Sequence, residues 1–293
     1  MSRAKHRPWL YAGAGVGAVA LAIALALTVF GGGNGGQPAS VGLPSTPDYH
    51  SLLVDPSNPE KLVLGTHAGL YVSSDGGRRW SFEALPGDDA MNLARAQAGD
   101  TVWLAGHHVF KKSSDGGATW RDVQPSGLPS LDIHGFAVDP SNPGTLYAAV
   151  AGLGLFRSQD EGTSFSLLSQ RVGGAVMALA VLPDGQILAG DMGQGLLESR
   201  DGGATWKQIM RAAIMGLAVN PSDPHRLLAS GAGVALSTND GRTWRSVLDL
   251  PEGTGPVAWS RSDPKLAYVV GFNRTLYRTL DSGNSWRPVA AGS

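Results

Sequence analysis

The octet "SSDGGATW" at Ser113–Trp120 decides the fold, because close copies of it stand at five other places in the chain. The copy "SSDGGRRW" at Ser73–Trp80 differs from it at only two positions. Its third residue is an aspartate in five copies and an asparagine in one, and these residues are Asp75, Asp115, Asp160, Asp201, Asn239 and Asp281. They are separated by 40, 45, 41, 38 and 42 residues, so the chain contains a sixfold internal repeat.

Each repeat contains four short runs rich in β-branched and aliphatic residues, separated by turn residues. In the first repeat the runs are "SLLV", "KLVLGT", "GLYVS" and "WSFEAL", and the octet stands between the third and the fourth. Four strands per repeat of this length are typical of a propeller blade, and a closed ring gives each sheet two neighbours. We therefore expect an all-β, six-bladed β-propeller over residues 47–293.

The octet itself is expected to be structural. Its aspartate can accept hydrogen bonds from backbone N–H groups of its own hairpin, as residues in Asx-turns do. The glycine two positions later permits a positive φ, and the terminal aromatic residue is expected to fill space between blades. A motif whose one recurring carboxylate is its third residue indicates architecture rather than six bound cations.

The octet resembles the Asp-box (BNR) repeat S-x-D-x-G-x-T-W, which is shared by sialidases, sortilin-type receptors and photosystem II assembly-factor-type propellers. The resemblance covers residues 47–293 and implies the propeller fold, with the boxes on the face opposite the active face of sialidase-like members. It implies little about function, because one fold carries many different sites. Asn239 departs from the motif but can accept the same hydrogen bonds.

The N-terminal residues differ in kind from the repeat. Arg3, Lys5 and Arg7 precede Trp9–Phe30, which are 22 residues without a charge and long enough to cross a bilayer as a helix. We expect residues 1–8 in the cytoplasm, a transmembrane signal anchor over 9–30, a Gly/Pro-rich tether over 31–46 and the propeller outside the cell. This predicts a single-pass protein of the cell membrane; a cleaved signal peptide is the alternative.

Composition excludes several classes of function. The formal net charge of −1 gives no reason to expect a nucleic-acid partner. Cysteine is absent, which excludes disulfides, thiolate metal sites and a cysteine nucleophile.

Histidine and methionine recur where the first strand of a repeat begins. Aligning the repeats places His50, Met91, His134, Met177 and Met215 at equivalent positions. The first strand of each blade lines the central channel, so these residues are expected to form part of a ring at one mouth. The turn after the second strand returns to the same mouth, which adds His67, Met192 and either His107 or His108, with His107 preferred.

Thioether and imidazole groups without cysteine favour a soft or borderline metal ion, copper above all. We therefore predict that His50, His67, Met91, His107, His134, Met177, Met192 and Met215 form a metal site, with a protein partner at the same mouth as a further expectation. The alternative is that methionine fills gaps along the channel and histidine faces its water.

Two functions stay open at this point. The first is a non-enzymatic binding scaffold with the His/Met mouth, which the sequence favours. The second is a glycoside hydrolase, sialidase-like or with two carboxylates, for which Asp89, Asp132 and Asp191 are candidates. The tyrosine, glutamate and arginine set that the resemblance would require for a sialidase cannot be placed, because most propeller arginines lie in or beside the octets.

Overall fold

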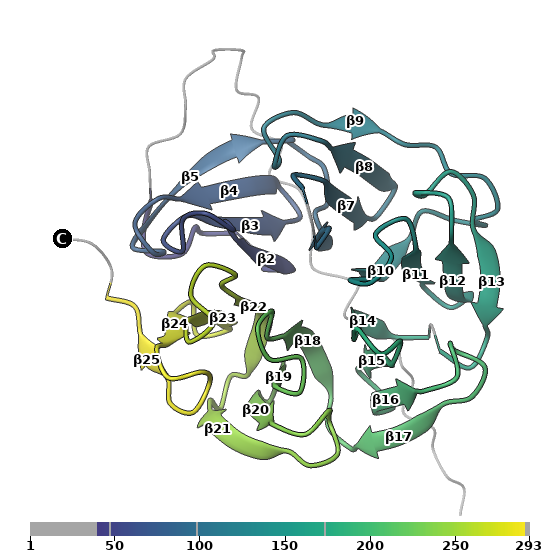
Figure 1. Ribbon diagram of the computed structural model, residues 1–293. Coiled ribbons are helices and arrows are strands. Elements are labelled where there is room, and N and C mark those ends of the chain that lie inside the picture. The colour runs from purple at the N-terminus through teal and green to yellow at the C-terminus, as the bar shows by residue number, and fades with distance from the viewer. Residues whose placement is uncertain (1–39, 47, 98, 173, 291–293) are drawn as a thin grey trace, which may run out of the picture. The chain divides into compact units, whose positions relative to one another are not determined.

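The computed structural model describes residues 40–290 except residues 47, 98 and 173. These residues form six antiparallel sheets arranged as blades around a central axis (Figure 1), which confirms the predicted six-bladed β-propeller. The part of the chain described here contains no helix long and apolar enough to span a membrane. The predicted anchor over residues 9–30 lies outside the described residues.

Each blade has four strands that follow one another from the axis to the rim (Figure 1). The strands of blades 1 to 6 are, in chain order, β2 (Ser51–Val54), β3 (Leu62–Thr66), β4 (Gly69–Ser73) and β5 (Arg79–Ala84); β6 (Asn92–Arg95), β7 (Val102–Gly106), β8 (Val109–Ser113) and β9 (Arg121–Asp122); β10 (Ile133–Val138), β11 (Leu146–Val150), β12 (Gly154–Ser158) and β13 (Ser166–Ser169); β14 (Val176–Val181), β15 (Ile187–Asp191), β16 (Gly195–Ser199) and β17 (Lys207–Met210); β18 (Ile214–Val219), β19 (Leu227–Gly231), β20 (Gly233–Ser237) and β21 (Arg245–Asp249); β22 (Thr254–Trp259), β23 (Ala267–Gly271), β24 (Leu276–Thr279) and β25 (Arg287–Pro288).

A fifth strand on the first blade corrects the predicted start of the propeller. Strand β1 (Ser40–Val41) pairs antiparallel with β5, with Ser40 opposite Trp80. Leu43 is buried in the core of the same blade. The last residues of the predicted tether therefore belong to the propeller, because their backbone covers the outer edge that β5 would otherwise expose.

The ring is closed by packing rather than by a shared sheet. Leu52 and Leu64 of blade 1 lie in one buried cluster with Tyr268 and Leu276 of blade 6. The Tyr268 hydroxyl also donates a hydrogen bond to the carbonyl oxygen of Pro59, at 3.2 Å. Repeats at the two ends of the chain therefore stabilise each other as any two neighbouring blades do.

The octets form the hairpins between the third and fourth strands, as predicted. In the second blade, Asp115 Oδ1 accepts hydrogen bonds from the backbone N–H of Thr119 at 2.8 Å and from the Ser113 hydroxyl at 2.7 Å. The Ser113 hydroxyl in turn accepts from the N–H of Gly117, whose φ is 100°. These bonds satisfy the backbone groups of the turn locally, as a structural role of the octet requires.

Asn239 keeps this arrangement without a charge. Its Oδ1 accepts from the N–H of Thr243 at 2.9 Å, and its Nδ2 donates to the Thr243 hydroxyl at 2.9 Å. In the second blade the direction of the last bond is reversed, because there the threonine hydroxyl donates to a carboxylate. The amide of Asn239 therefore makes hydrogen bonds to the same groups of the hairpin as the carboxylate of Asp115 does in the second blade.

The aromatic residues that end the octets are buried to different extents. Trp80 is 1% exposed and Phe165 is 6% exposed. Trp120, Trp206, Trp244 and Trp286 are only partly buried and pack at the edges of core clusters. The expectation that these residues fill space between blades holds fully for the first and third copies only.

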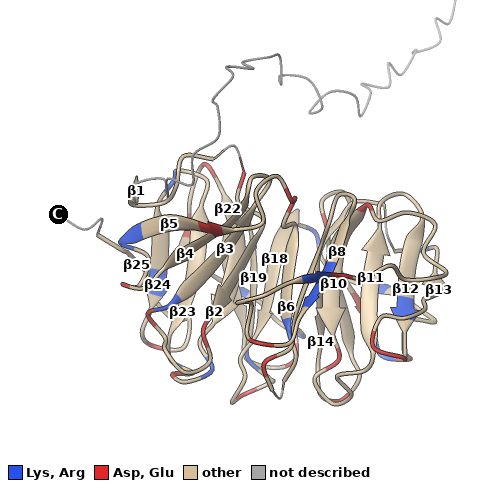
Figure 2. Ribbon diagram, turned by 90° about the horizontal axis from the view of Figure 1, so that it is seen from above, with Lys and Arg blue, Asp and Glu red and all other residues tan. Residues whose placement is uncertain are grey.

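Two faces of the disc receive different turns. Leu62 pairs with Ser73 at one end of the β3–β4 hairpin and Thr66 pairs with Gly69 at the other, so the octet and the β3–β4 turn lie on opposite faces. Figure 2 shows the strands running between these two faces, with acidic residues in loops on both. The innermost strands line a central cavity of about 300 Å³ between the faces.

Candidate functional site

The face opposite the octets carries a cluster of imidazoles and carboxylates from three consecutive blades. Asp48, Asp89 and Asp132 lie just before the innermost strands β2, β6 and β10. The cluster, called the His/Asp row below, consists of His50, His67, His107, His134, Asp48, Asp89 and Asp132. The structure therefore brings all four of the predicted histidines together, and three aspartates with them.

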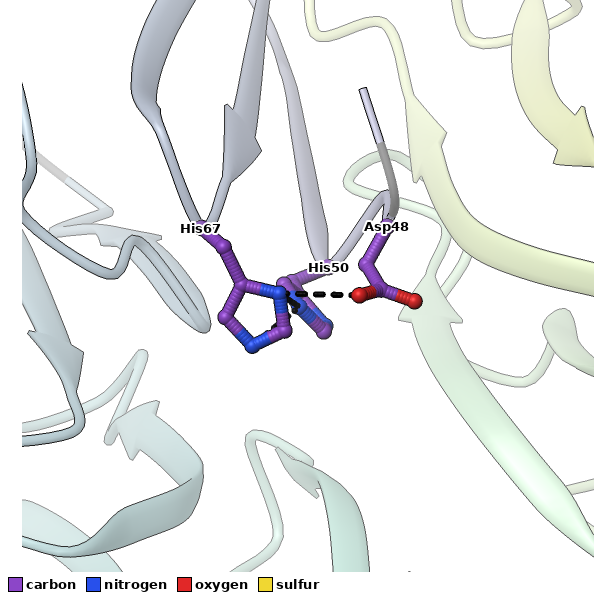
Figure 3. Close-up of side chains that lie close together, drawn as sticks. All are labelled: Asp48, His50 and His67. Carbon is purple, nitrogen blue, oxygen red and sulfur yellow. Dashed lines mark hydrogen bonds and ion pairs between the residues drawn. The ribbon is translucent and has the colours of Figure 1, made fainter. Parts of the chain in front are cut away.

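Blade 1 provides the first end of the row (Figure 3). His67, in the β3–β4 turn, has its Nδ1 atom 2.9 Å from Asp48 Oδ2. His50 Nε2 lies 3.1 Å from Nδ1 and 3.2 Å from Nε2 of His67, and the two rings meet edge to face at 84°. One carboxylate and two imidazoles thus meet at the start of β2.

Asp89 occupies the middle of the row. Its Oδ2 atom lies 3.2 Å from His67 Nε2 and 2.5 Å from His107 Nδ1, so one carboxylate oxygen faces two histidines of neighbouring blades. Asp89 is 9% exposed, the most buried carboxylate of the row. Its other oxygen, Oδ1, is buried without a hydrogen-bond partner among the described residues.

A glycine allows Asp89 to approach His107. A Cβ atom on Gly106 would lie 1.9 Å from the Asp89 carbonyl oxygen, which no side chain could occupy without a shift of the backbone. Gly106 ends β7, directly before His107. The sequence therefore has a glycine at the end of β7, where the backbone of the β7–β8 turn lies directly against the backbone of Asp89.

Blade 3 provides the other end of the row. His107 Nε2 lies 2.9 Å from His134 Nε2 and 3.2 Å from Asp132 Oδ1. The Asp132 oxygen is also 3.0 Å from His134 Nε2. The backbones of His107 and Asp132 form an isolated bridge between blades 2 and 3, which holds the two side chains in register.

His50 is held in its neutral form. Burial, followed by the neighbouring imidazole of His67, lowers the pKa of His50 to about 4. Its imidazole is therefore uncharged at neutral pH and can offer a lone pair to a cation.

The row contains three overlapping groups that could hold a metal ion. They are Asp48 with His50 and His67, Asp89 with His67 and His107, and Asp132 with His107 and His134. Within each group the candidate ligand atoms all lie within 4.8 Å of one another. Two imidazole nitrogens with one carboxylate oxygen suit Zn(II), Cu(II) and similar divalent ions. Without a metal, the same groups can form a network of ion pairs.

The methionines are placed differently from the histidines. Met91, Met177 and Met215 line the central cavity, together with His50. Met192 follows β15 and is 45% exposed. Of the two adjacent histidines in the β7–β8 turn, His107 is in the row, whereas His108 is exposed with a φ of 59°. The groups of histidines and carboxylates described above offer nitrogen and oxygen atoms.

The aspartates of the row were not predicted as metal ligands. Their signal is present in the sequence as Asp-x-His or Asp-x-Met, in "DYH" at Asp48, "DAM" at Asp89 and "DIH" at Asp132. The third candidate carboxylate of a hydrolase, Asp191, is structural: it is 2% exposed and accepts hydrogen bonds from the N–H groups of Ala175, Gly193 and Gln194.

Fold and site together define an Asp-box β-propeller with a polar His/Asp mouth. The chain belongs to the family described as photosynthesis system II assembly factor YCF48, whose model matches residues 48–292. A solved structure of YCF48 bound to D1 peptide is similar, with a TM-score of 0.54 and 19% identity over 86% of this chain and 83% of that chain.

Glycoside hydrolases share the fold. The GH74 xyloglucanase from Xanthomonas campestris superposes with a TM-score of 0.61 at 19% identity, over 88% of this chain and 47% of that one. An oligoxyloglucan-reducing end-specific xyloglucanase of Emericella nidulans is 26% identical in an alignment of 139 residues that covers 39% of this chain and 17% of the enzyme. The chain thus spans less than half the length of these enzymes.

Proposed function

We propose that the protein is a binding scaffold, anchored in the membrane by residues 9–30, whose His/Asp row binds a divalent metal ion outside the cytoplasm. The observation that carries the proposal is the convergence of four imidazoles and three carboxylates from three blades at one mouth. Most histidines of the chain stand here, although the repeat that builds the blades does not require a histidine.

Copper remains the proposed metal, in the divalent state. The neighbouring ligand atoms are imidazole nitrogens and carboxylate oxygens, which favour Cu(II) over the Cu(I) that thioethers would select. At a nitrogen and oxygen site Cu(II) binds more tightly than Zn(II), the second choice. Met91, Met177 and Met215 line the cavity that His50 also lines.

Metal titration of the full-length protein tests the proposal. After treatment with a chelator, the detergent-purified chain is titrated with Cu(II), Zn(II) and Mg(II) by calorimetry, and bound metal is measured by elemental analysis. We expect tight Cu(II), weaker Zn(II) and no Mg(II). His67→Ala should weaken Cu(II) binding at least tenfold, because His67 belongs to two of the three groups.

His225→Ala is the matched control. His225 lies in the turn before β19 and pairs with Asp240 of an octet, outside the row. Equal losses in the two variants, or no metal bound by the wild type, would contradict the proposal and leave the row as an ion-pair network.

The scaffold role rests on the family. A member is described as bound to a D1 peptide, so we propose that this propeller likewise binds a peptide segment of a partner protein. Membrane anchoring is tested separately by fractionation. The full chain should stay with membranes after an alkaline wash, and a chain without residues 9–30 should be released.

A glycoside hydrolase is the second candidate, supported by the 26% identity to the Emericella nidulans xyloglucanase. The hydrolase would use Asp132 or Asp89, the two carboxylates of the His/Asp row that are not engaged by backbone amides in the way Asp191 is. Incubation with xyloglucan oligosaccharides distinguishes the two functions. Turnover that is lost in Asp132→Asn and is independent of added metal would favour the hydrolase.

A further inference from the structure

We infer that the His/Asp row binds two metal ions, one at each end, and that Asp89 between them orients His67 and His107 without being a ligand. The inference deepens the proposed function and rests on it. It assigns one ion to Asp48, His50 and His67 and the other to Asp132, His107 and His134.

The contacts of Asp89 set the orientation of both shared imidazoles. With Asp48 and Asp132 as ligands of an ion at each end, Asp89 is the carboxylate left to accept hydrogen bonds. We therefore assign the N–H groups to the nitrogens that face it, His67 Nε2 at 3.2 Å and His107 Nδ1 at 2.5 Å. A neutral imidazole carries one N–H group, which leaves the lone pairs on His67 Nδ1 and His107 Nε2. These two atoms face opposite ends of the row.

Each lone pair meets one further imidazole and one carboxylate. His67 Nδ1 lies 2.9 Å from Asp48 Oδ2 and 3.1 Å from His50 Nε2. His107 Nε2 lies 2.9 Å from His134 Nε2 and 3.2 Å from Asp132 Oδ1. The two ends thus have the same ligand set, two nitrogens and one oxygen, although they are built from different blades.

The distances favour the ends over the middle. With metal–ligand bonds of about 2.1 Å, two ligands of one ion lie roughly 3.0 to 3.4 Å apart. The spacings at the ends, 2.9 to 3.2 Å, approach this range, and so does the 3.2 Å between Asp89 Oδ2 and His67 Nε2. The 2.5 Å between Asp89 Oδ2 and His107 Nδ1 is too short for two ligands of one ion. A single ion in the middle would also leave His50 and His134 without a role as ligands.

Asp89 has the properties of an outer carboxylate of a metal site. A histidine ligand commonly donates its second N–H to such a carboxylate, which fixes the ring and raises its basicity. Here one buried carboxylate serves two histidines whose rings are nearly parallel, at 15°, with centroids 6.0 Å apart. The two ions would therefore be coupled through one side chain.

Stoichiometry tests the inference, with Zn(II) as the probe and the full-length chain in detergent. The wild type should bind two Zn(II) per chain by elemental analysis after gel filtration. His50→Ala and His134→Ala should each bind one, and the double variant none. Loading the wild type with Cu(II) should broaden the electron paramagnetic resonance spectrum by coupling between two ions, and each single variant should remove the broadening.

Asp89→Asn tests the positioning role. The amide oxygen can accept from both imidazoles but carries no negative charge, so it raises the basicity of the two rings less, and Zn(II) should still bind at both ends but about 10- to 100-fold more weakly. Asp191→Asn is the control, because Asp191 is also buried and contacts backbone amides of its own blade 4, outside the row. It should lower the melting temperature and leave Zn(II) affinity unchanged. Equal Zn(II) affinity in Asp89→Asn and the wild type would overturn the role of Asp89.

The failures of the two proposals are distinguishable. One Zn(II) per wild-type chain that is lost in Asp89→Ala and kept in His50→Ala and His134→Ala would place a single ion in the middle. That result overturns the inference and leaves the proposed metal site. No bound Zn(II) or Cu(II) in the wild type, with an unchanged melting curve, overturns both. Circular dichroism of each variant identifies any that fails to fold, and Asp48→Asn then replaces His50→Ala.

Discussion

Aspartates on the two faces of the propeller have different partners. On the octet face, Asp115 and its counterparts accept hydrogen bonds from their own hairpin, in each of the five blades that keep the aspartate. On the other face, Asp48, Asp89 and Asp132 contact imidazoles of their own and neighbouring blades. The first arrangement stabilises a turn. The second brings together nitrogen and oxygen atoms that could act as metal ligands.

The difference shows how a repeat fold separates stability from binding. A contact within one hairpin can be copied in every blade, because it needs nothing from the neighbours. A contact between blades depends on which residues the neighbour presents, and among the described residues the groups of imidazoles and carboxylates occur in blades 1 to 3. Blade 4 has Met177 and Asp191 on the same face, but Asp191 is saturated by backbone N–H groups.

The largest expected effect is a loss of stability when a buried residue of the octet face is removed. Trp80→Ala should lower the free energy of unfolding by about 3 to 5 kcal/mol, since Trp80 is 1% exposed and its indole N–H donates to Gly77. Trp120→Ala should cost less, because Trp120 is only partly buried. Urea unfolding of both variants measures the difference; equal losses would contradict the assigned burial.

Gly106→Ala should weaken metal binding at the His/Asp row and lower the stability of the fold less than Trp80→Ala does. The added Cβ must displace the segment around Asp89, so metal affinity should fall about tenfold or more, as expected for disturbing an outer carboxylate. Calorimetry with Zn(II) and a melting curve are compared for this variant. Gly152→Ala is the control, because its Cβ would meet nothing within 4 Å, although its φ of 69° adds some backbone strain. Unchanged affinity in Gly106→Ala would argue against the packing of β7 on Asp89.

Lowering the pH should progressively remove the stabilisation that the octet aspartates provide. The Thr119 hydroxyl, followed by the Thr119 backbone N–H, lowers the pKa of Asp115 to about 2, and Thr205 has the same effect on Asp201. Because these values lie below those of an unfolded chain, the stabilisation is complete above about pH 4 and is lost as pH falls through 2. The melting temperature should fall by several degrees over this range, and less steeply in Asp115→Asn. Parallel curves for the two proteins would contradict the role of the charge.

Asn239→Asp should have the smallest effect. The carboxylate would accept from the Thr243 hydroxyl, as Asp115 accepts from Thr119, in place of the bond that Asn239 now donates. We expect a change of at most about 2 °C in melting temperature near neutral pH, and a steeper loss of stability below pH 4. Differential scanning calorimetry at pH 7 and pH 3 measures both; a large loss at pH 7 would show that the amide is required.

Much of the fold could be predicted from the sequence because its information is local and repeated. Every octet contains the aspartate or asparagine, the glycine and the aromatic residue that one hairpin needs, so the blade count followed from the spacing. The start of the propeller could not be predicted in this way. Ser40 and Val41 pair with β5 through backbone groups, and nothing in their side chains indicates that pairing.

The candidate site was only half predictable. Aligning the repeats placed His50 and His134 at one mouth, and the turn positions added His67 and His107. The same alignment grouped Met177 and Met215 with them, because equivalent positions in a ring look equally close to the axis. Which side chains touch depends on the rotation of each blade and on the turns between strands, and these are set by packing.

The sequence by itself determined the sixfold repeat, the hairpin caps and the face to which histidines and methionines are directed, since all three depend on residues close together in the chain. Only the tertiary structure decided that Asp89 lies between His67 and His107 and that imidazoles of the row meet carboxylates. These contacts join residues of different blades, and their distances follow from how the sheets pack around the axis.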